Sequence, residues 1–378
     1  MIRFVHSADW QLGMTRREYL GAEAQARFVA ARIEAVTAIG RLARDQRCPF
    51  VVVAGDVFET NHVERQIVVR ALEAMAATPE VTFHLLPGNH DPLDAASVFR
   101  SPTFVEHQPA NVNVLTGETV PIAPGVELIP APWPTKRPLV DLLGARLADL
   151  PVDGTRRIVV GHGRLDHLTP DEVDPALVRA SALEAAVADG RVHYIALGDR
   201  HSTTSVGSSG RIWYAGAPEP TDFRETDPGN VLLVSLDPAT AQVSVNPRHI
   251  GTWTFVRHEA ELTGEADLRL LETFLDALPQ KTRTIVRLAL RGQLSLAEKA
   301  ALDRLLAHYG DLFATVHGWE RRIDLMVLPD DTDFAGLELS GFAGDALADL
   351  RELATGTDAQ ATVAQDALAL LYRIGGAA

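Results

Sequence analysis

Hydrophobic residues follow two different periods along the first half of the chain. Short apolar runs of the kind that form buried strands recur at intervals, and between them apolar residues lie three or four positions apart, as on one face of a helix. The expected strands are Ile2 to Val5, Phe50 to Val53, Val81 to Leu86, Val126 to Pro130, Ile158 to Val160 and Tyr194 to Leu197. Strands that alternate with helices favour a layered α/β fold.

Two helices are expected between the first three strands, and more strands after the sixth. The helices present apolar faces formed by Val29, Ile33, Val36 and Gly40 and by Ile67, Ala71, Leu72 and Met75. From Arg211 to Asn246 the sequence is typical of β structure, with turn signals at 208–210, 227–229 and 237–238. This segment resembles the closing strands of a sandwich.

The pattern changes beyond residue 250, where a small α+β unit is expected. Its elements are a helix with Leu268, Leu271, Leu275 and Leu278, a strand from Arg283 to Arg291, a helix that begins with a capping box of Ser295 and Glu298, a strand from Arg322 to Leu328 and a last helix with Val363, Ala367, Leu370 and Leu371. The last helix either packs within this unit or binds a helix of a partner. Since single cores stop growing at roughly 250 to 300 residues, we expect two domains, 1–250 and 251–378.

Composition and charge narrow the class of protein. Hydrophobic residues make up 46% and charged residues 22% of the 378 residues, as in ordinary globular proteins. Cys48 is the only cysteine, so we expect neither an internal disulfide nor a thiolate metal cluster. The first residues do not resemble a signal peptide, and no apolar run is long enough to cross a membrane. We therefore expect a soluble, cytoplasmic protein without a membrane contact.

The chain is acidic, with a formal net charge of −15. Proteins bind phosphate backbones mainly through Lys and Arg, so this charge argues against a general affinity for DNA or anionic membranes. Any contact with nucleic acid would need a local basic patch, a bound metal or a partner. One candidate patch is Lys136 and Arg137 beside Trp133 in a Pro-rich loop, for which ordinary loop packing is the alternative explanation.

Clusters of Asp, Asn, His and Gly follow the expected strands directly. They are Asp9 to Gly13, Gly55 to Glu59, Gly88 to Asp91, Gly161 to Gly163 and Gly198 to His201. One cluster alone could be a turn, since Asp, Asn and Gly favour turns. Ligands in layered α/β folds lie at the carboxyl ends of strands, so five clusters in order indicate one site. Oxygen and imidazole ligands suit Mn²⁺, Mg²⁺, Fe or Zn²⁺, and two such ions can hold a phosphoryl oxygen.

The order of these motifs, together with Ser7 to Trp10 and Trp213 to Glu219, resembles the SbcD nuclease subunits within the calcineurin-like metallophosphoesterases. Their relatives include the YhaO-like DNA repair exonucleases and the meiotic recombination eleven nuclease. The resemblance covers residues 1 to 235 well, and the later part only in the order of its elements. It implies a metallophosphoesterase β-sandwich flanked by helices, with a smaller C-terminal α+β capping domain.

The resemblance also implies a role for each motif residue. Asp9 and His201 would bind one metal, Asn89 and His162 the other, and Asp56 would bridge them. His90 would be the catalytic histidine that stabilises or protonates the leaving oxygen, with Asp91 orienting it. Arg200 is a candidate contact for the substrate phosphate, with a surface role as the alternative.

Three positions depart from the family pattern. Gln11 and Asp199 stand where a histidine is usual, and Glu59 replaces another. Gln11 can offer an amide oxygen and Asp199 a carboxylate, so the site becomes richer in oxygen. We expect a preference for Mn²⁺, or Mg²⁺, over Zn²⁺.

Three functions remain open from the sequence. The first is a DNA repair nuclease with two metals, for which the resemblance implies DNA, an SbcC-like coiled-coil ATPase and a second copy of the chain as partners. The second is a phosphoesterase for a small phosphodiester or a phosphoprotein. The third is a scaffold that keeps the fold but has lost activity through the changes at Gln11 and Asp199.

Overall fold

The computed structural model describes residues 1–168, 174–327, 341–356 and 358–375, without the side chains of 362, 369 and 372–375. The chain divides into two compact units. The first contains Met1–Arg16 and Gln25–Trp253, and the second contains Arg17–Ala24 and Thr254–Ala378. Among the described residues, no helix is both long and apolar enough to cross a membrane.

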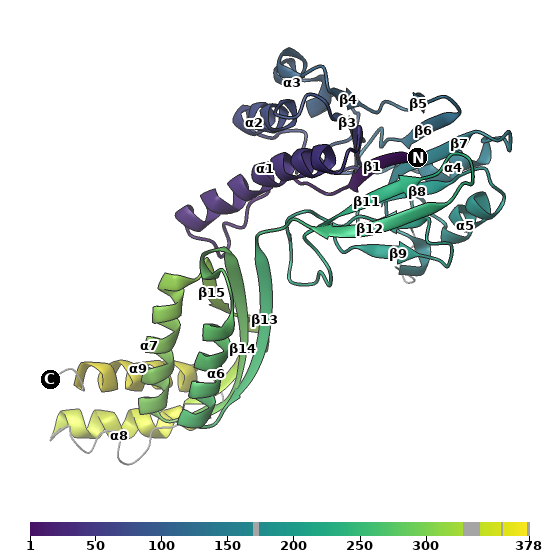
Figure 1. The fold of residues 1–378 in the computed structure, drawn as a ribbon. Coiled ribbons are helices and arrows are strands. Elements are labelled where there is room, and N and C mark those ends of the chain that lie inside the picture. Colours follow the sequence, from purple (N-terminus) through teal and green to yellow (C-terminus); the bar gives the residue numbers. More distant parts are fainter. Residues whose placement is uncertain (169–173, 328–340, 357, 376–378) are drawn as a thin grey trace. The chain divides into compact units, whose positions relative to one another are not determined.

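The first unit is built on two mixed sheets of six strands each (Figure 1). One has the order β12-β11-β1-β2-β3-β4 and the other β5-β6-β7-β8-β10-β9. Their strands are β1 (Ile2–Ser7), β2 (Phe50–Val53), β3 (Thr82–Leu85), β4 (Val112–Val114), β5 (Val120–Ala123), β6 (Val126–Ala131), β7 (Arg156–His162), β8 (Tyr194–Gly198), β9 (Thr204–Val206), β10 (Ile212–Tyr214), β11 (Asn230–Leu236) and β12 (Val243–His249). Every expected strand of this half is present, and the α/β class is confirmed.

Apolar side chains on both faces of each sheet explain the layers. Phe4 and Val52 on one sheet pack against Val160 and Tyr194 on the other, which joins the sheets in a sandwich. The outer faces are covered by helices, with which they form two further apolar clusters. The helices of this unit are α1 (Ala22–Asp45), of which the part from Gln25 on belongs to it, α2 (Arg65–Ala76), α3 (Pro102–His107), α4 (Leu142–Ala148) and α5 (Ala180–Ala188), with short 3-10 turns at Val98–Arg100 and Asp166–Leu168.

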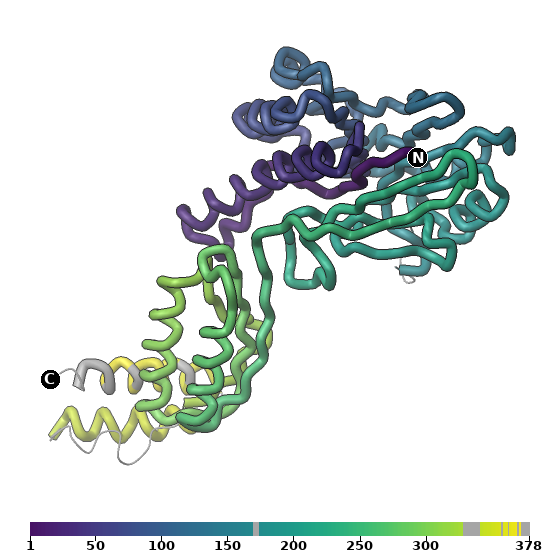
Figure 2. Tube along the Cα trace, in the orientation of Figure 1, coloured from purple at the N-terminus to yellow at the C-terminus, as the bar shows by residue number. Residues whose placement is uncertain are grey.

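The sandwich brings the carboxyl ends of five strands together. Strands β1, β2 and β3 run parallel in one sheet, as do β7 and β8 in the other. Figure 2 shows how the N-terminal strand, in purple, runs beside the green chain of β11, with which it pairs antiparallel. The loops that carry the motif residues leave the ends of these five strands.

The second unit is a four-stranded sheet with helices. Its elements are β13 (Thr254–Leu262), α6 (Glu265–Ala277), β14 (Thr284–Leu294), α7 (Leu296–Leu312), β15 (Thr315–Gly318), β16 (Asp324–Val327), α8 (Phe342–Ala354) and α9 (Ala359–Gly375), with 3-10 turns at Lys281–Arg283 and Glu320–Arg322. The expected strand forms β14, in which Thr284, Val286, Leu288 and Leu290 are buried, and the expected capping box of Ser295 and Glu298 begins α7. Tyr19, from the N-terminal segment of this unit, stacks on His317 with ring centroids 4.9 Å apart.

The sequence predicted this unit less completely than the first. Strands β13 and β15 and helix α8 were not expected, and Leu328 at the end of the last expected strand lies outside the described residues. Helix α9 forms, but its apolar face differs from the expectation: Ala364 and Leu368 are buried, whereas Val363 is 68% and Leu370 51% exposed.

Candidate metal centre

The residues that follow the strand ends are held in a strained backbone conformation. Asp9, Gln11, Asp56 and Asp199 have φ angles of 53°, 44°, 53° and 97°, in the left-handed region. They are four of the seven non-glycine residues with positive φ among those the structure describes. Such conformations are unfavourable for residues with a Cβ and gather at functional sites, where the surrounding structure maintains them.

Two carboxylates and one imidazole form the centre of this site. Ligand atoms of Asp9, Asp56 and His162 all lie within 4.8 Å of one another, and the three residues are buried. The Nε2 atom of His162 lies 3.4 Å from Asp56 Oδ1 and 3.8 Å from Asp199 Oδ1. The motifs after β1, β2, β7 and β8 therefore converge, as the sequence predicted.

The environment of His162 favours a cation beside its Nε2 atom. Nδ1 lies 2.9 Å from the carbonyl oxygen of Ala54, to which it donates, so Nε2 carries the lone pair in the neutral ring. Nε2 lies 2.7 Å from Asn89 Oδ1, which is also an acceptor. His162 Nε2 and Asn89 Oδ1 are both acceptors, so they can lie this close only with a proton or a metal ion beside them. A metal ion can take the place of the proton and also pairs with the buried carboxylates.

The pKa values of the buried residues also indicate that this site favours positive charge. Burial lowers the pKa of His162, but the carboxylates of Asp56, Asp9 and Asp199 outweigh burial and raise the pKa well above its usual value. Burial also raises the pKa of Asp9, to about 6, against the opposing effect of the histidines. For Asp56, burial is outweighed by His162, so its pKa is lowered.

Gln11 and His201 form a second part of the site. Gln11 Nε2 lies 3.2 Å from His201 Nε2, and the Gln11 Oε1 atom is buried with no hydrogen-bond partner among the described residues. A buried amide oxygen without a partner is costly, and a metal ion would satisfy it. Gln11 can therefore take the place of the usual histidine ligand.

The ring of His201 is oriented by residues that the sequence analysis did not single out. Its Nδ1 atom lies 2.6 Å from Thr221 Oγ1 and 3.0 Å from Glu225 Oε1, which directs Nε2 into the site. Burial lowers the pKa of His201, but the hydrogen bond to Glu225 and the charge of Asp9 raise it to about 9. In the sequence, the only hint of this contact was an acidic residue, Glu225, in the loop that follows the Trp213 to Glu219 segment.

His90 lies at the rim of the site, and Asp91 does not orient it. The His90 ring is 33% exposed, with Nε2 4.0 Å from Asp56 Oδ2 and Nδ1 donating to the Glu59 carbonyl oxygen at 2.9 Å. The buried Asp91 carboxylate instead accepts from the backbone N–H groups of Phe58 and Gly88, at 2.9 and 2.8 Å. The expectation for Asp91 is corrected: its carboxylate joins the two loops by these hydrogen bonds and forms none with the His90 ring among the described residues. Burial raises its pKa to about 7.

Arg200 and Trp133 lie close to the site without entering it. Arg200 donates to Thr204 Oγ1 at 2.9 Å and lines a small cavity of about 160 Å³ beside Asp199, so its contact with substrate stays a prediction. Trp133 is 9% exposed, and its Nε1 donates to the carbonyl oxygen of His162 at 2.7 Å. The indole is packed within the protein beside His162, as in the alternative explanation of ordinary loop packing.

Two glycines permit the loops to approach one another this closely. A Cβ on Gly55, whose φ is +94°, would lie 2.2 Å from His162 Nδ1. A Cβ on Gly88 would lie 2.2 Å from Asp56 Oδ1 and 2.5 Å from Asp56 N. Real Cβ atoms do not come this near to other heavy atoms, so both positions require glycine.

Comparison with known proteins identifies the family. Residues 2–234 match the calcineurin-like phosphoesterases, which is more than half of the chain. The chain belongs to the calcineurin-like phosphoesterase family. The fold is therefore a metallophosphoesterase fold, and the family is one of metal-dependent hydrolases. No curated protein matches the chain.

Solved structures that resemble this phosphoesterase are distant from it. The protein TT1561 of Thermus thermophilus is 9% identical, with a TM-score of 0.39, and 65% of this chain and 98% of that one are covered. A dimetal phosphatase from Danio rerio is 15% identical, with a TM-score of 0.37 and coverage of 62% and 92%. The purple acid phosphatase PPD1 from yellow lupin is 12% identical, with a TM-score of 0.33 and coverage of 66% and 54%.

The donor atoms of this phosphoesterase fit the metal ions that the family uses. Buried carboxylates, a partnerless amide oxygen and imidazole nitrogens with their lone pairs directed into the site form a set suited to hard or borderline divalent cations. The residues that could hold metal are Asp9, Gln11, Asp56, Asn89, His162, Asp199 and His201.

Proposed function

We propose that this protein is a two-metal phosphodiesterase that cleaves DNA, a repair nuclease of the SbcD type. The observation that carries the proposal is the convergence of Asp9, Asp56 and His162 within 4.8 Å, at the meeting point of five strand ends. When bound, a pair of divalent ions supplies an activated water and neutralises charge on the phosphate. The oxygen-rich donor set supports Mn²⁺, with Mg²⁺ as the alternative.

The residues of the site divide into two sets of ligands in this proposal. Asp9, Gln11 and His201 hold one ion, and Asn89 and His162 hold the other. Asp56 lies between the two sets, and Asp199 is close enough to His162 to join the second. The ring partners of the two histidines fix which nitrogen each presents, so the site is organised before metal binds.

His90 has the position of a group that assists the leaving oxygen. Since its Nδ1 donates to the Glu59 carbonyl, its Nε2 carries a proton only in the charged form of the ring. In that form Nε2, which lies 4.0 Å from Asp56 Oδ2, can donate a proton to the departing oxygen. A partly exposed ring is also accessible to a substrate phosphate.

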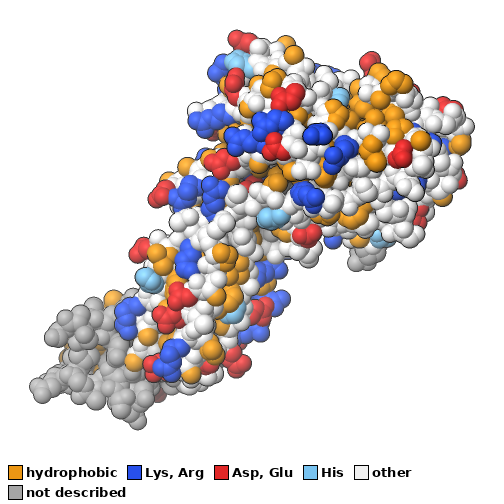
Figure 3. Space-filling model, viewed as in Figure 1, with side chains coloured by type: hydrophobic (Ala, Val, Ile, Leu, Met, Phe, Trp, Pro, Cys, Tyr) orange, Lys and Arg blue, Asp and Glu red, His pale blue; other side chains and the backbone are white. Residues whose placement is uncertain are grey.

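The acidic charge of the chain supports shared binding of DNA. On the face shown in Figure 3, basic and acidic side chains are interspersed on the first unit. With a net charge of −15, much of the affinity for DNA would come from a partner, for which we propose a coiled-coil ATPase of the SbcC type. A second copy of the chain is a further proposed partner, and the cytoplasm the proposed location.

A scaffold without activity is the second candidate function. The observation that favours it is the hydrogen bond between Gln11 Nε2 and His201 Nε2, because it occupies the nitrogen that would bind metal. If this contact persisted in the presence of metal ions, one of the two sites would stay empty. Such a protein would keep the fold while losing turnover.

Activity of the purified chain with Mn²⁺ separates these functions. The substrates are labelled single- and double-stranded DNA and a chromogenic phosphodiester, each assayed with and without the ion. We expect DNA cleavage that depends on Mn²⁺ and falls about 10²- to 10⁴-fold in His90→Ala, the usual contribution of a general acid. His308→Ala is the matched control, since His308 is exposed on α7 in the second unit.

Each other outcome selects an alternative. Cleavage of the small diester without cleavage of DNA would favour a phosphoesterase for small substrates. No metal binding and no turnover would favour the scaffold. Full activity of His90→Ala would refute the role of that residue while leaving the metal centre in place.

A further inference from the structure

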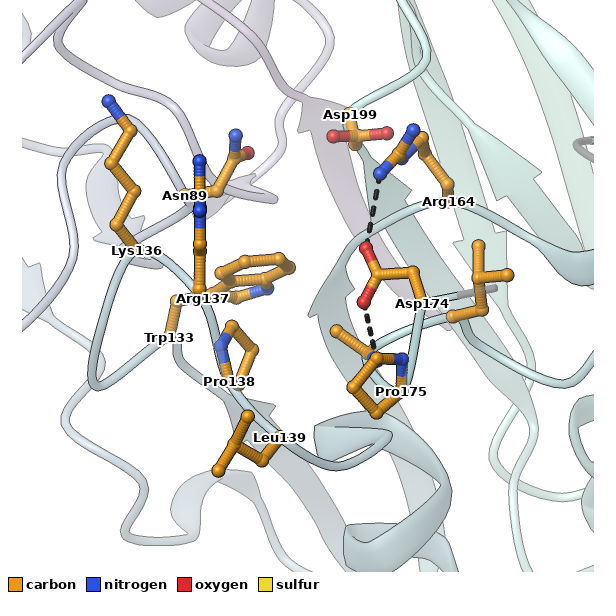
Figure 4. A pocket seen from close by; sticks show the side chains of 12 residues that line it. Asn89, Trp133, Lys136, Arg137, Pro138, Leu139, Arg164, Asp174, Pro175 and Asp199 are labelled. Atoms are coloured by element: carbon orange, nitrogen blue, oxygen red, sulfur yellow. Dashed lines mark hydrogen bonds and ion pairs between the residues drawn. The ribbon is translucent and has the colours of Figure 1, made fainter. Parts of the chain in front are cut away.

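A cleft adjoins the metal centre and extends beyond the residues used so far. Its volume is about 800 Å³, within the range of sites that enclose a nucleotide-sized ligand. Asn89 and Asp199 line the cleft where it meets the metal centre (Figure 4). The remaining walls carry side chains that metal binding leaves unexplained, among them Lys136, Arg137 and Arg164.

One wall of this cleft is cationic. Lys136 and Arg137 are exposed on the loop between β6 and α4, and their side chains form no ion pair with any residue that the structure describes. The chain has only three lysines, and Lys136 is the single one before residue 281. In a protein of net charge −15, two adjacent cations without a carboxylate partner produce a local positive potential at this wall.

On the opposite wall of the cleft, the positive charge of Arg164 is neutralised by a carboxylate. Arg164 Nη2 lies 3.2 Å from Asp174 Oδ2, and Figure 4 shows this pair across the cleft from Lys136 and Arg137. The other Asp174 oxygen accepts from the N–H of Ala176 at 2.9 Å, which keeps the carboxylate in place. Positive charge that is available to a ligand is therefore concentrated on the Lys136 and Arg137 wall.

The cationic loop is tied to the metal centre at its base. The Trp133 indole donates to the His162 carbonyl oxygen, and the Trp133 backbone bonds to Pro87 and Leu93, on either side of Asn89. Pro138, after the cations, is buried. The loop therefore has a fixed base beside Asn89, and Lys136 and Arg137 lie at a set position along the cleft. Preorganised charges bind an anion with less loss of entropy than mobile ones.

We propose that Lys136 and Arg137 bind a second phosphate of the substrate, next to the phosphodiester held at the metal centre. This inference rests on the proposed function and narrows it, because a diester with a single phosphate or a singly phosphorylated side chain has no second phosphate to offer. The substrate is then a nucleic-acid strand with at least two consecutive phosphates. Lys and Arg contacts to phosphate supply most of the affinity in such complexes, without sequence preference.

Binding of short strands tests this directly and needs no turnover. Fluorescently labelled phosphorothioate oligothymidylates, which resist hydrolysis, are titrated with the Mn²⁺-loaded protein at several salt concentrations. The variant is Lys136→Ala/Arg137→Ala, and the control is Arg65→Ala/Arg70→Ala, which removes two exposed cations of α2. The ligands are a dinucleotide with one internucleotide phosphorothioate, a trinucleotide with two, and a dodecamer.

The expected results concern both affinity and salt dependence. The wild type and the control bind the trinucleotide about tenfold more tightly than the dinucleotide, and the Lys136→Ala/Arg137→Ala variant loses this difference. For the dodecamer, the slope of log affinity against log salt falls in that variant by about 0.7, the contribution of one neutralised phosphate of a single strand.

Two outcomes would overturn the inference and can be told apart. If the variant kept both the trinucleotide preference and the salt slope while the wild type cleaved DNA, the second-phosphate site would be refuted and the nuclease function would stand. If the wild type neither bound the dodecamer nor cleaved DNA, both would be refuted together. Circular dichroism confirms that each variant is folded.

Discussion

The left-handed residues Asp9, Gln11, Asp56 and Asp199 show how the site stores strain. Each such residue costs of the order of 1 kcal/mol or more relative to an ordinary conformation. The cost is offset by backbone hydrogen bonds between the loops, such as Gln11 N to the Asp56 carbonyl at 2.9 Å. The loops therefore stabilise one another's conformation, and a substitution in one loop should shift the ligand residues of the neighbouring loop.

Gly88→Ala is expected to weaken metal binding at least tenfold. The added Cβ would lie 2.2 Å from Asp56 Oδ1, so the carboxylate between the two ligand sets must move. Isothermal titration with Mn²⁺ measures the effect. Gly310→Ala is the control, because a Cβ there meets nothing within 4 Å and improves the propensity of helix α7. Equal affinity in both variants would show that Asp56 does not bind the metal.

The sequence predicted which residues gather at the site better than how they are oriented. Residue type and position after a strand were sufficient for Asp9, Asp56 and His162. The partners of the His201 ring were missed, because Thr221 and Glu225 lie in a loop without periodicity. In such a loop, only the folded structure shows which side chains contact the ring. Asp91 was misassigned because its carboxylate accepts from the backbone N–H groups of Phe58 and Gly88, contacts that the sequence alone does not show.

At the scale of elements, the long apolar runs were predicted, whereas short strands and the nine-residue strand β13, which carries several charged residues, were not. All six strands expected before residue 200 are present within a few residues of their expected bounds. Strands β4, β9 and β15 have three or four residues each and depend on pairing with a neighbour, so local sequence carries little signal for them. Helix α9 shows the same limit, since two stripes of an Ala-rich helix can each be the packed one.

Ser295→Ala tests the clearest local signal in the second unit. Ser295 Oγ accepts from the N–H of Glu298 at 3.2 Å, and Glu298 Oε2 accepts from the Ser295 N–H at 2.8 Å. Loss of the first bond should lower the free energy of unfolding by about 1 kcal/mol. Urea denaturation followed by circular dichroism measures this. Ser205→Ala, at an exposed position of β9, should change it by less than about 0.5 kcal/mol.

At the scale of the whole molecule, buried histidines should set the acid limit of stability. Burial lowers the pKa of His84 to about 4 and that of His6 to about 3, so both are neutral in the folded protein at pH 5. The unfolded chain takes up protons at these residues below about pH 6.5. Their contribution therefore favours unfolding as the pH falls from 6.5 toward the folded pKa values.

His84→Leu should reduce the loss of unfolding free energy that accompanies acidification. His84 is 4% exposed and lies in β3, against the ring of Phe50. Each unit of pKa difference is worth about 1.4 kcal/mol, so His84 accounts for a loss of about 2 kcal/mol between pH 6.5 and pH 5. Urea denaturation at both pH values should show that difference shrink in His84→Leu and stay unchanged in His308→Leu. An unchanged pH dependence in His84→Leu would contradict the assignment.

The stacking of Tyr19 on His317 has a consequence for dissecting the protein. Because Arg17–Ala24 belongs to the second unit, the backbone crosses between units at 16–17, 24–25 and 253–254. A gene fragment that starts at Thr254 would encode a second unit lacking one of its own pieces. A fragment that ends at Trp253 would carry that piece with nothing to pack on. Protease cleavage between Trp253 and Thr254 should therefore leave two fragments that stay associated, held by the borrowed segment.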